Sequence, residues 1–277
     1  MERQIVEPQI VATEETVQLV QITDTHLFAD DEGCLLSVNT GQSFIATVND
    51  IVERNVEFDA IVATGDISQD HSAASYTRFA DGIKPLEKQC YWLPGNHDQK
   101  SNMVTVLPSP QIQEVGHVLA GEYWQIIMLD SQVEGLPHGY LETDQLELLH
   151  NKLAEFPERH TLVLLHHNAL PIGSAWLDQH KLQRAHQFWE VLGRHQNVRA
   201  VLGGHVHQDF EKEHNGVRVL ATPSTCIQFK ANNDEFALDT LSPGWRHLQL
   251  HKDGQLESQV HRLEEGCFIP DFEAEGY

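Results

Sequence analysis

Five short apolar segments, each followed at once by residues that can bind a metal, are the feature that most constrains this chain. The segments are Val17–Ile22, Asp59–Ala63, Cys90–Leu93, Thr161–Leu165 and Val198–Leu202. They are short, rich in aliphatic residues and in several cases continuously apolar, which is typical of strands buried on both faces. The chain is therefore predicted to fold in layers, with these strands at its centre.

Other segments complete an alternation of strands and helices. Three more segments are predicted as strands, the last two near a sheet edge because they alternate more: Gln125–Leu129, Val217–Ala221 and Trp245–Leu250. Three segments carry apolar residues at helical spacing: one after Thr40, one that Thr143 could cap and Pro157 would end, and His180–Arg194. Strands alternating with helices indicate a layered α/β fold.

The chain of 277 residues has the length of one large domain or two small ones, and it has neither an internal repeat nor a Gly/Ser-rich linker. Residues 1–16 contain four Glu and no apolar stretch, which is unlike a secretory signal. We predict that residues 1–16 are a solvated lead-in and that residues 17–277 form a single domain.

The charge balance excludes several classes of function. Asp and Glu number 41 against 18 Lys and Arg, so the net charge is −23, and such a chain lacks the cationic surface that binds nucleic acid or anionic lipid. No apolar run approaches the roughly 18–20 residues that a membrane span needs. The four cysteines contain no CxxC pair, which favours reduced thiols in a cytoplasmic protein and leaves two disulfides as the alternative.

The residues that follow the five apolar segments share one chemistry. They supply Asp, Asn and His side chains and no Cys: Asp24, His26, Asp66, Asn96, His166, His205 and His207. The carboxyl ends of parallel strands meet at one rim, so these distant residues are expected to converge there. If Asp66 bridges, the seven residues can hold two divalent ions, which is a standard arrangement for in-line displacement at phosphorus.

Each motif alone is weak evidence. An Asp-x-His tripeptide or a Gly-Asp pair is usually a turn, and His166-His167 could be buried core histidines. Five motifs in order, each at a predicted strand end, are much harder to explain without one shared site. The donor set suits manganese, iron or zinc, and the lack of Cys argues against a structural thiolate zinc site.

The order DxH, GD, GNHD, HH and GHxH resembles the calcineurin-like metallophosphoesterase superfamily. The stretches ITDTHLF, FDAIVATGDISQD, YWLPGNHD, PERHTLVLLHHNALPIGSAWLDQHKL, ATPSTCIQFK and SPGWRHLQLH resemble bacterial class III 3′,5′-cyclic AMP phosphodiesterases. The resemblance runs from about Val17 to the last residue. It implies an α/β metallophosphoesterase fold: a central β-sandwich flanked by helices, with the dimetal site at the C-terminal ends of strands.

The resemblance also implies a role for each motif residue. One metal would be held by Asp24, His26, Asp66 and His207. The other would be held by Asp66, Asn96, His166 and His205. His97 would be the catalytic residue that contacts phosphate near the leaving group, and substrate contacts would come from His26, Asp66, Asn96, His97 and His207. One departure is the sequence after His166-His167, where many relatives have a proline earlier than Pro171.

The implied activity is hydrolysis of 3′,5′-cyclic AMP to 5′-AMP by a dimetal-bound hydroxide, which would lower intracellular cyclic AMP. The resemblance implies two divalent ions per chain, iron or manganese, with zinc or cobalt as alternatives. It implies a cyclic nucleotide as the small-molecule partner. The charge balance predicts neither nucleic acid nor membrane as a partner, the cysteines predict a cytoplasmic protein, and we expect a monomer or homodimer. The alternatives are another phosphodiesterase of the superfamily, such as a glycerophosphodiester hydrolase, and a non-catalytic binding scaffold.

Three neighbouring residues have two interpretations each. Asp98 either orients the His97 imidazole or caps a turn. Strand alternation predicts that His167 points to the opposite face from His166, in the core or behind the site. Trp176 either stacks on adenine or packs in the protein, and packing is the more frequent role of tryptophan.

Overall fold

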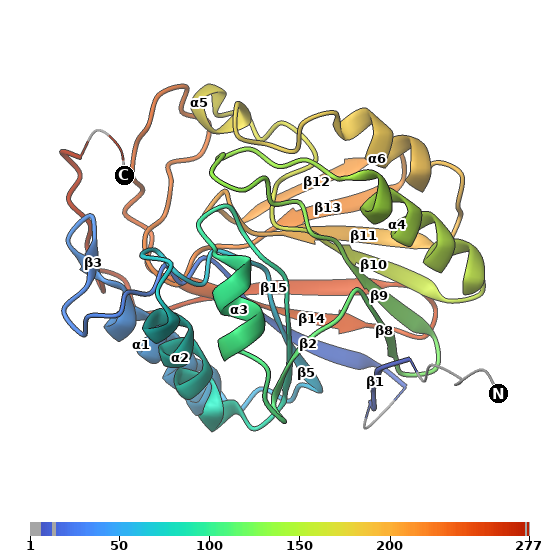
Figure 1. The fold of residues 1–277 in the computed structure, drawn as a ribbon, viewed down its shortest axis with the longest axis horizontal. Coiled ribbons are helices and arrows are strands. Elements are labelled where there is room, and N and C mark those ends of the chain that lie inside the picture. Colours follow the sequence, from blue (N-terminus) through green and yellow to red (C-terminus); the bar gives the residue numbers. More distant parts are fainter. Residues whose placement is uncertain (1–6, 13–14, 275, 277) are drawn as a thin grey trace.

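Two β-sheets pack face to face, and helices cover both outer faces (Figure 1). The computed structural model describes residues 7–12, 15–274 and 276. The resulting order of layers is helix, sheet, sheet, helix, which buries both faces of each sheet. The predicted β-sandwich flanked by helices is therefore confirmed.

The six-stranded sheet has the strand order β15-β14-β2-β5-β6-β7. Strands β2, β5, β6 and β7 are parallel, whereas β14 runs antiparallel to both β2 and β15. In chain order the six strands are β2 (Val17–Ile22), β5 (Ala60–Ala63), β6 (Gln89–Trp92), β7 (Ile112–Glu114), β14 (Gly244–Leu250) and β15 (Leu256–Arg262).

The seven-stranded sheet has the strand order β1-β8-β9-β10-β11-β13-β12. Its centre, from β9 to β13, is parallel, and β8 and β12 run antiparallel to their inner neighbours. The strands are β1 (Gln9–Ile10), β8 (His117–Ala120), β9 (Trp124–Met128), β10 (His160–Leu164), β11 (Val198–Gly203), β12 (Phe210–His214) and β13 (Val217–Ala221). A separate small hairpin pairs β3 (Cys34–Leu35) with β4 (Val38–Asn39).

Three helices lie against the six-stranded sheet: α1 (Thr40–Glu53), α2 (Ala73–Gly82) and α3 (Lys100–Val106). Helices α4 (Thr143–Glu155) and α6 (Ala185–Leu192) lie against the seven-stranded sheet (Figure 1). Short helical segments also form at α5 (Ala175–Asp178) and at Lys84–Leu86. Each helix group has its own apolar core, represented by Phe44 and Phe79 on one side and Leu149 and Phe188 on the other.

The largest apolar core lies between the two sheets. Leu19 and Val62 of one sheet and Trp124, Leu164 and Leu202 of the other belong to it, and all five side chains are fully buried. Because each central strand has an apolar core on both faces, its sequence is apolar without alternation. This is the physical reason that several of the five apolar segments are continuously apolar.

The strand predictions hold within one or two residues, and the strands β13 and β14 each lie second from a sheet edge, as their alternation predicts. Two helix predictions need correction. Thr143 does not cap α4: the N-cap position is Glu142, and Thr143 is the first helical residue. The segment His180–Arg194 is helical only from Ala185, because Arg184 has a left-handed backbone conformation (φ 51°) that interrupts a helix.

The predicted lead-in is partly structured. Residues 1–6 and 13–14 of that segment lie outside the described residues. Within it, Gln9–Ile10 form strand β1, which pairs with β8, and Ile10 is buried. Glu7 accepts hydrogen bonds from Lys152 (2.6 Å) and His117 (2.9 Å). The lead-in is therefore not wholly solvated, because Gln9–Ile10 add a strand to the edge of the sheet.

The remaining general features concern the cysteines, the surface and the helices. All four cysteines are free thiols, so the disulfide alternative is wrong.

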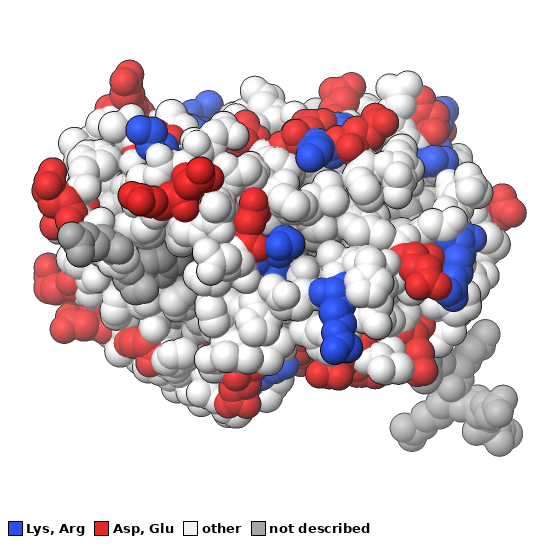
Figure 2. All heavy atoms as spheres, turned by 90° about the horizontal axis from the view of Figure 1, so that it is seen from above, with Lys and Arg blue, Asp and Glu red and all other residues white. Residues whose placement is uncertain are grey.

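On the face seen in Figure 2, Lys and Arg are scattered among Asp and Glu, and the residues drawn there in colour form no continuous basic patch. None of the helices that the structure describes is long and apolar enough to cross a membrane.

Candidate dimetal site

The predicted site residues follow the ends of strands from both sheets. Asp24, Asp66 and Asn96 come within four residues of the ends of β2, β5 and β6 in the six-stranded sheet. His166 and His205 come two residues after β10 and β11 in the seven-stranded sheet. The rim is therefore shared by two packed sheets, and the side chains meet across the end of the sandwich.

The backbone at this rim has an unusual conformation. Five of the seven predicted metal ligands have a positive φ: Asp24 (53°), His26 (45°), Asp66 (50°), His205 (69°) and His207 (49°). Such angles are uncommon for residues with a Cβ, and they persist where the surroundings hold the chain in place. Part of this constraint is visible, since the Asp24 and His26 amides donate to the carbonyls of Gly65 and Asp66 (both 3.0 Å). The left-handed turns direct side chains from different strands toward one point.

The candidate ligand atoms fall into overlapping groups. Atoms of Asp24, His26 and His207 lie within 4.8 Å of one another, and those of Asp24, Asp66 and His166 do so as well. Asp66 also groups with His26 and His97. Asn96 Oδ1 lies 3.1 Å from His166 Nε2, which in turn lies 3.2 Å from Asp66 Oδ2. The structure thus brings all seven predicted residues together, with Asp66 between the groups.

Hydrogen bonds fix which histidine nitrogen faces the centre. His207 Nδ1 donates to the Ile227 carbonyl (2.9 Å), and His166 Nδ1 donates to the Thr64 carbonyl (2.8 Å). A carbonyl accepts only, so in the neutral ring each Nε2 carries a lone pair. His26 Nδ1 is paired likewise with Gln69 Oε1 (2.7 Å). Such second partners orient the histidines of metal sites.

Two observations show that these residues fit metal ions. The Nε2 atoms of His26 and His207 lie 3.2 Å apart, so two inward lone pairs face each other unless a cation lies beside them. His205 Nε2 is buried and has no hydrogen-bond partner. An unsatisfied buried nitrogen is costly in a folded protein, and a metal ion would satisfy it. These His and Asp clusters are suited to a dimetal site.

Charge and burial determine the protonation of the site. Burial lowers the pKa of His26 to about 3, against the opposing charge of Asp66, so this ring is neutral at pH 7 and can bind a metal. Burial also lowers the pKa of His205, and the electrostatic effect of the neighbouring His167 lowers it further. Burial acts in the same direction on His166, but the charge of Asp66 outweighs it and raises that pKa to about 9. The pKa of Asp66 is low because the nearby histidines outweigh the opposing effect of burial.

Two glycines leave room for the carboxylates. A Cβ at Gly95 would overlap the Asp66 carboxylate, and a Cβ at Gly204 would overlap Thr23 and Asp24 Oδ2. The His205 amide donates to both Asp24 carboxylate oxygens (3.0 and 3.1 Å), and the His97 amide donates to Asp66 Oδ1 (2.8 Å). The glycines in the GNHD and GHVH motifs are therefore needed for close backbone approach.

Asp98 holds two turns of the site together. Its carboxylate accepts hydrogen bonds from the amides of Ile67 (3.1 Å), Ser68 (3.1 Å) and Gly95 (2.9 Å), and from the Tyr76 hydroxyl (3.1 Å). These bonds tie the segment after β5 to the segment after β6. They favour the turn-capping interpretation of Asp98, in which it positions the loops that carry Asp66 and His97.

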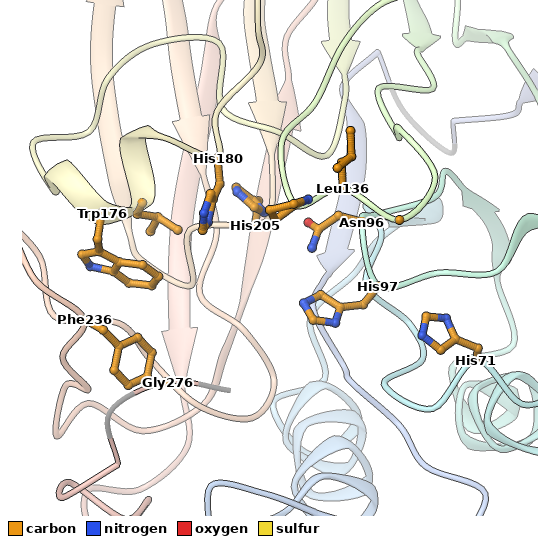
Figure 3. A pocket seen from close by; sticks show the side chains of 12 residues that line it. His71, Asn96, His97, Leu136, Trp176, His180, His205, Phe236 and Gly276 are labelled. Atoms are coloured by element: carbon orange, nitrogen blue, oxygen red, sulfur yellow. The ribbon is translucent and has the colours of Figure 1, made fainter.

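A pocket of about 470 Å³ opens beside the site, within the range of small-molecule sites. Asn96, His97 and His71 line one side, and Trp176 and Phe236 line the opposite side (Figure 3). The His97 ring is half-buried and lies 5.0 Å from the His26 ring, centroid to centroid, in an edge-on arrangement. His97 therefore lies between the ligand cluster and the open pocket.

His167 lies differently from the prediction, and Trp176 combines the two roles considered for it. His167 does not point away from the site: its ring lies 4.8 Å from that of His205 and 4.9 Å from that of His166. The reason is that β10 ends at Leu164, so strand alternation no longer applies at His167. Trp176 packs edge-on against Phe229 (5.0 Å) and also lines the pocket.

Sequence reasoning missed several supporting residues. Gln69 pairs with His26, and Phe229 stacks on the His207 ring at 4.3 Å with an interplanar angle of 15°. Gln21, which is fully buried, donates to Thr64 Oγ1 (2.7 Å) and to the Gly203 carbonyl (2.9 Å), and so connects the two sheets beneath the site. One signal was present for Gln21, which is a polar residue in an otherwise apolar part of β2.

The family model for calcineurin-like phosphoesterases matches residues 17–209. A solved dimetal phosphatase from Danio rerio aligns with a TM-score of 0.61, covering 90% of this chain and 99% of that chain. Its sequence is 14% identical, so the likeness shows the fold alone. The chain belongs to the calcineurin-like phosphoesterase family.

More similar relatives narrow the group within this family. A protein of Vibrio vulnificus is 59% identical over 96% of this chain and 97% of its own length. Relatives in Escherichia coli K12 (51% identical) and Pseudomonas aeruginosa (40% identical) show the same coverage. All three are named 3′,5′-cyclic adenosine monophosphate phosphodiesterase CpdA. The predicted likeness to bacterial cyclic AMP phosphodiesterases is confirmed.

Proposed function

We propose that this protein hydrolyses 3′,5′-cyclic AMP to 5′-AMP. The observation that carries the proposal is the convergence of seven Asp, Asn and His side chains at one rim, where His26 and His207 direct Nε2 lone pairs at each other from 3.2 Å. The relatives named cyclic AMP phosphodiesterase span nearly the whole chain. The reaction adds water to phosphorus and breaks the P–O3′ bond, which opens the ring.

Two divalent ions would be held by the seven residues, with Asp66 shared. We assign Asp24, His26 and His207 to one ion and Asn96, His166 and His205 to the other. When bound, the ions supply an activated water and positive charge for the phosphate oxygens. Iron or manganese is the proposed metal, with zinc or cobalt as alternatives, because four His among seven ligands suit borderline ions.

The first prediction concerns the metal. Chelation is expected to abolish activity, and manganese, iron, zinc or cobalt should restore it more readily than calcium, which prefers an all-oxygen ligand set. The measurement is turnover after dialysis against chelator and readdition of single metals, with metal content determined in parallel. Restoration by calcium alone would rule out the proposed ligand set.

His97 is proposed as the catalytic proton donor. The O3′ leaving group is a poor alkoxide and needs a proton, and His97 lies between the ligand cluster and the pocket. Burial lowers the pKa of His97, with Asp66 opposing. A bound anionic phosphate would raise that pKa again by favouring the imidazolium form. His26, Asp66, Asn96 and His207 are proposed as the other contacts of the substrate phosphate.

The wider proposals concern the whole protein. The described residues from strand β1 onward are proposed to form one domain, and the protein to act as a cytoplasmic monomer or homodimer. The small-molecule partner is a cyclic nucleotide, with no role for nucleic acid or membrane, in keeping with the net charge of −23.

A substrate panel tests the function directly. Metal-loaded protein would be assayed with cyclic AMP, bis(p-nitrophenyl) phosphate, glycerophosphocholine and a phosphomonoester. The proposal expects cyclic AMP to have the highest kcat/KM and 5′-AMP to be the product. If glycerophosphocholine or the monoester is preferred by tenfold or more, the protein is a different phosphoesterase of the same family.

A further inference from the structure

The pocket beside the metal-binding residues has an aromatic wall to which the proposed chemistry gives no role. We use the term aromatic wall for Trp176 and Phe236, which line the pocket opposite Asn96 and His97 (Figure 3). Trp176 belongs to α5, after β10, and Phe236 lies in the loop between β13 and β14. Two distant segments thus bring large aromatic side chains to the same side of one pocket.

Packing holds the aromatic wall in place. The Trp176 ring meets the Phe229 ring edge-on at 5.0 Å and the Phe236 ring at 5.1 Å. The Trp176 amide donates to the Asp234 carbonyl (3.1 Å), which ties α5 to the loop that carries Phe236. Rings fixed in this way lose little conformational freedom when a ligand binds, and this favours binding.

The aromatic wall is contiguous with the candidate metal ligands. Phe229, against which Trp176 packs, is buried and stacks almost parallel on the His207 ring at 4.3 Å. One buried ring therefore separates Trp176 from a proposed ligand. A ligand whose phosphate lies at the metals would have the rest of its body directed into the pocket, along this wall.

The chemistry of the pocket selects the class of ligand. The described residues that line it include no Asp, Glu, Lys or Arg, and its far side consists of Trp176, Leu177 and Phe236 together with the His180 ring. Such a surface recognises a flat uncharged ring by stacking. Stacking is strong for nucleobases and works for any base. A glycerophosphodiester has no planar group that would use it.

We propose that Trp176 and Phe236 form a base-stacking subsite that receives the purine of the nucleotide. This inference rests on the proposed function, since it assumes a phosphate at the metal-binding residues. The subsite contributes binding energy through the base and contacts neither the phosphorus nor the leaving oxygen. Loss of the subsite therefore weakens the binding only of ligands that carry a base.

The test compares two ligands that differ only by the base. Calorimetry on the metal-loaded protein would measure Kd for 5′-AMP and for ribose 5-phosphate, in wild type and in Trp176→Leu. We expect the Kd for 5′-AMP to rise about tenfold in the variant, the usual effect of losing one aromatic stacking partner, and that for ribose 5-phosphate to stay unchanged. An equal rise for both ligands, or no rise for either, overturns the subsite.

Control variants separate stacking from damage to the fold. Trp189→Leu removes a half-buried tryptophan in α6 that packs on Phe188 and His214 and does not line the pocket, so it should preserve the wild-type ratio of the two Kd values. Phe236→Leu should raise the ratio of the Kd for 5′-AMP to the Kd for ribose 5-phosphate, as Trp176→Leu does, and it serves as the test if Trp176→Leu does not fold. If the wild-type protein hydrolyses cyclic AMP but Trp176→Leu and Phe236→Leu both keep the wild-type ratio of the two Kd values, this inference alone is refuted. Wild type without that activity refutes the proposed function.

Discussion

The two walls of the pocket are built in different ways. The wall that carries the candidate metal ligands comes from residues that follow strand ends directly, and left-handed backbone turns such as those at Asp24 and Asp66 orient them. The aromatic wall comes from α5 and a long loop, and Trp176 and Phe236 are placed by packing on each other and on Phe229. One wall is set by short-range geometry on rigid strands, and the other by tertiary contacts between connections.

The difference suggests a division of labour. Groups that act on phosphorus must be held within a few tenths of an ångström, and strand ends supply that rigidity. Recognition of the rest of a substrate tolerates more variation, and connections between strands supply it in many folds. Changes to the first wall should therefore affect every phosphodiester, whereas changes to the aromatic wall should affect only ligands that carry a base.

The largest effect is expected from Asp66→Ala, which removes the carboxylate shared by the two ligand groups. The variant should lose at least one ion and turnover of every diester, because Asp66 Oδ2 lies near one proposed ligand of each ion, 3.9 Å from His26 Nε2 and 3.2 Å from His166 Nε2. Metal analysis and assays with cyclic AMP and bis(p-nitrophenyl) phosphate would show this. Asp81→Ala, which removes an exposed carboxylate paired with Lys84 at 2.6 Å, is the control. Two ions with normal activity in Asp66→Ala would end the dimetal assignment.

The contrast between the walls also explains what the sequence could predict. The motif residues lie next to apolar strands, so spacing along the chain was enough to place Asp24, Asp66 and His205 at one rim. The aromatic wall has no such local signature, because Trp176 and Phe236 come together only when two connections between strands fold over the sandwich. Helix α2 was missed for a similar reason, since Tyr76 and Phe79 carry most of its apolar face and the sheet beneath stabilises it.

The limits of local pattern are clearest at the ends of elements. Alternation of strand faces gave a wrong orientation for His167, because the strand had already ended. The predicted N-cap of α4, Thr143, lies one residue after the observed one, since Glu142 and Thr143 are both compatible with a helix start. Where the chain leaves regular structure, long-range contacts decide the orientation, and a single sequence does not contain them in readable form.

The next effect tests the chemistry of the wall that carries the candidate metal ligands. His97→Ala should keep both ions and lower kcat on cyclic AMP by about 10²–10⁴, the usual contribution of a positioned general acid. Activity on bis(p-nitrophenyl) phosphate should fall much less, since nitrophenolate leaves without a proton. Steady-state kinetics with both substrates would measure the contrast. Equal losses would make His97 a binding residue only, and loss of metal would place it among the ligands.

The smallest effect concerns the buried residue that joins the two sheets beneath the site. Gln21 donates to Thr64 Oγ1 and to the Gly203 carbonyl, and the Thr64 carbonyl accepts from His166 Nδ1. The Gln21 carbonyl accepts from the Thr222 hydroxyl, which itself accepts from Arg246 Nε (2.8 Å). Gln21 thus connects the segment that orients His166 with the strand that precedes His205.

Gln21→Leu should lower the free energy of unfolding by about 1–3 kcal/mol, because the buried Thr64 hydroxyl loses its donor and the buried Thr222 hydroxyl loses its acceptor. It should also weaken metal binding, since the two halves of the rim are no longer held together. Gln125→Leu is the matched control: Gln125 is equally buried and donates to Thr161 Oγ1 (2.9 Å), but it lies in β9, none of whose residues belongs to the ligand groups. Denaturant unfolding and competition with a metal indicator would compare the two. Equal loss of stability with weaker metal binding only in Gln21→Leu would show that Gln21 positions the rim. Unchanged metal affinity in both variants would reduce it to a structural residue.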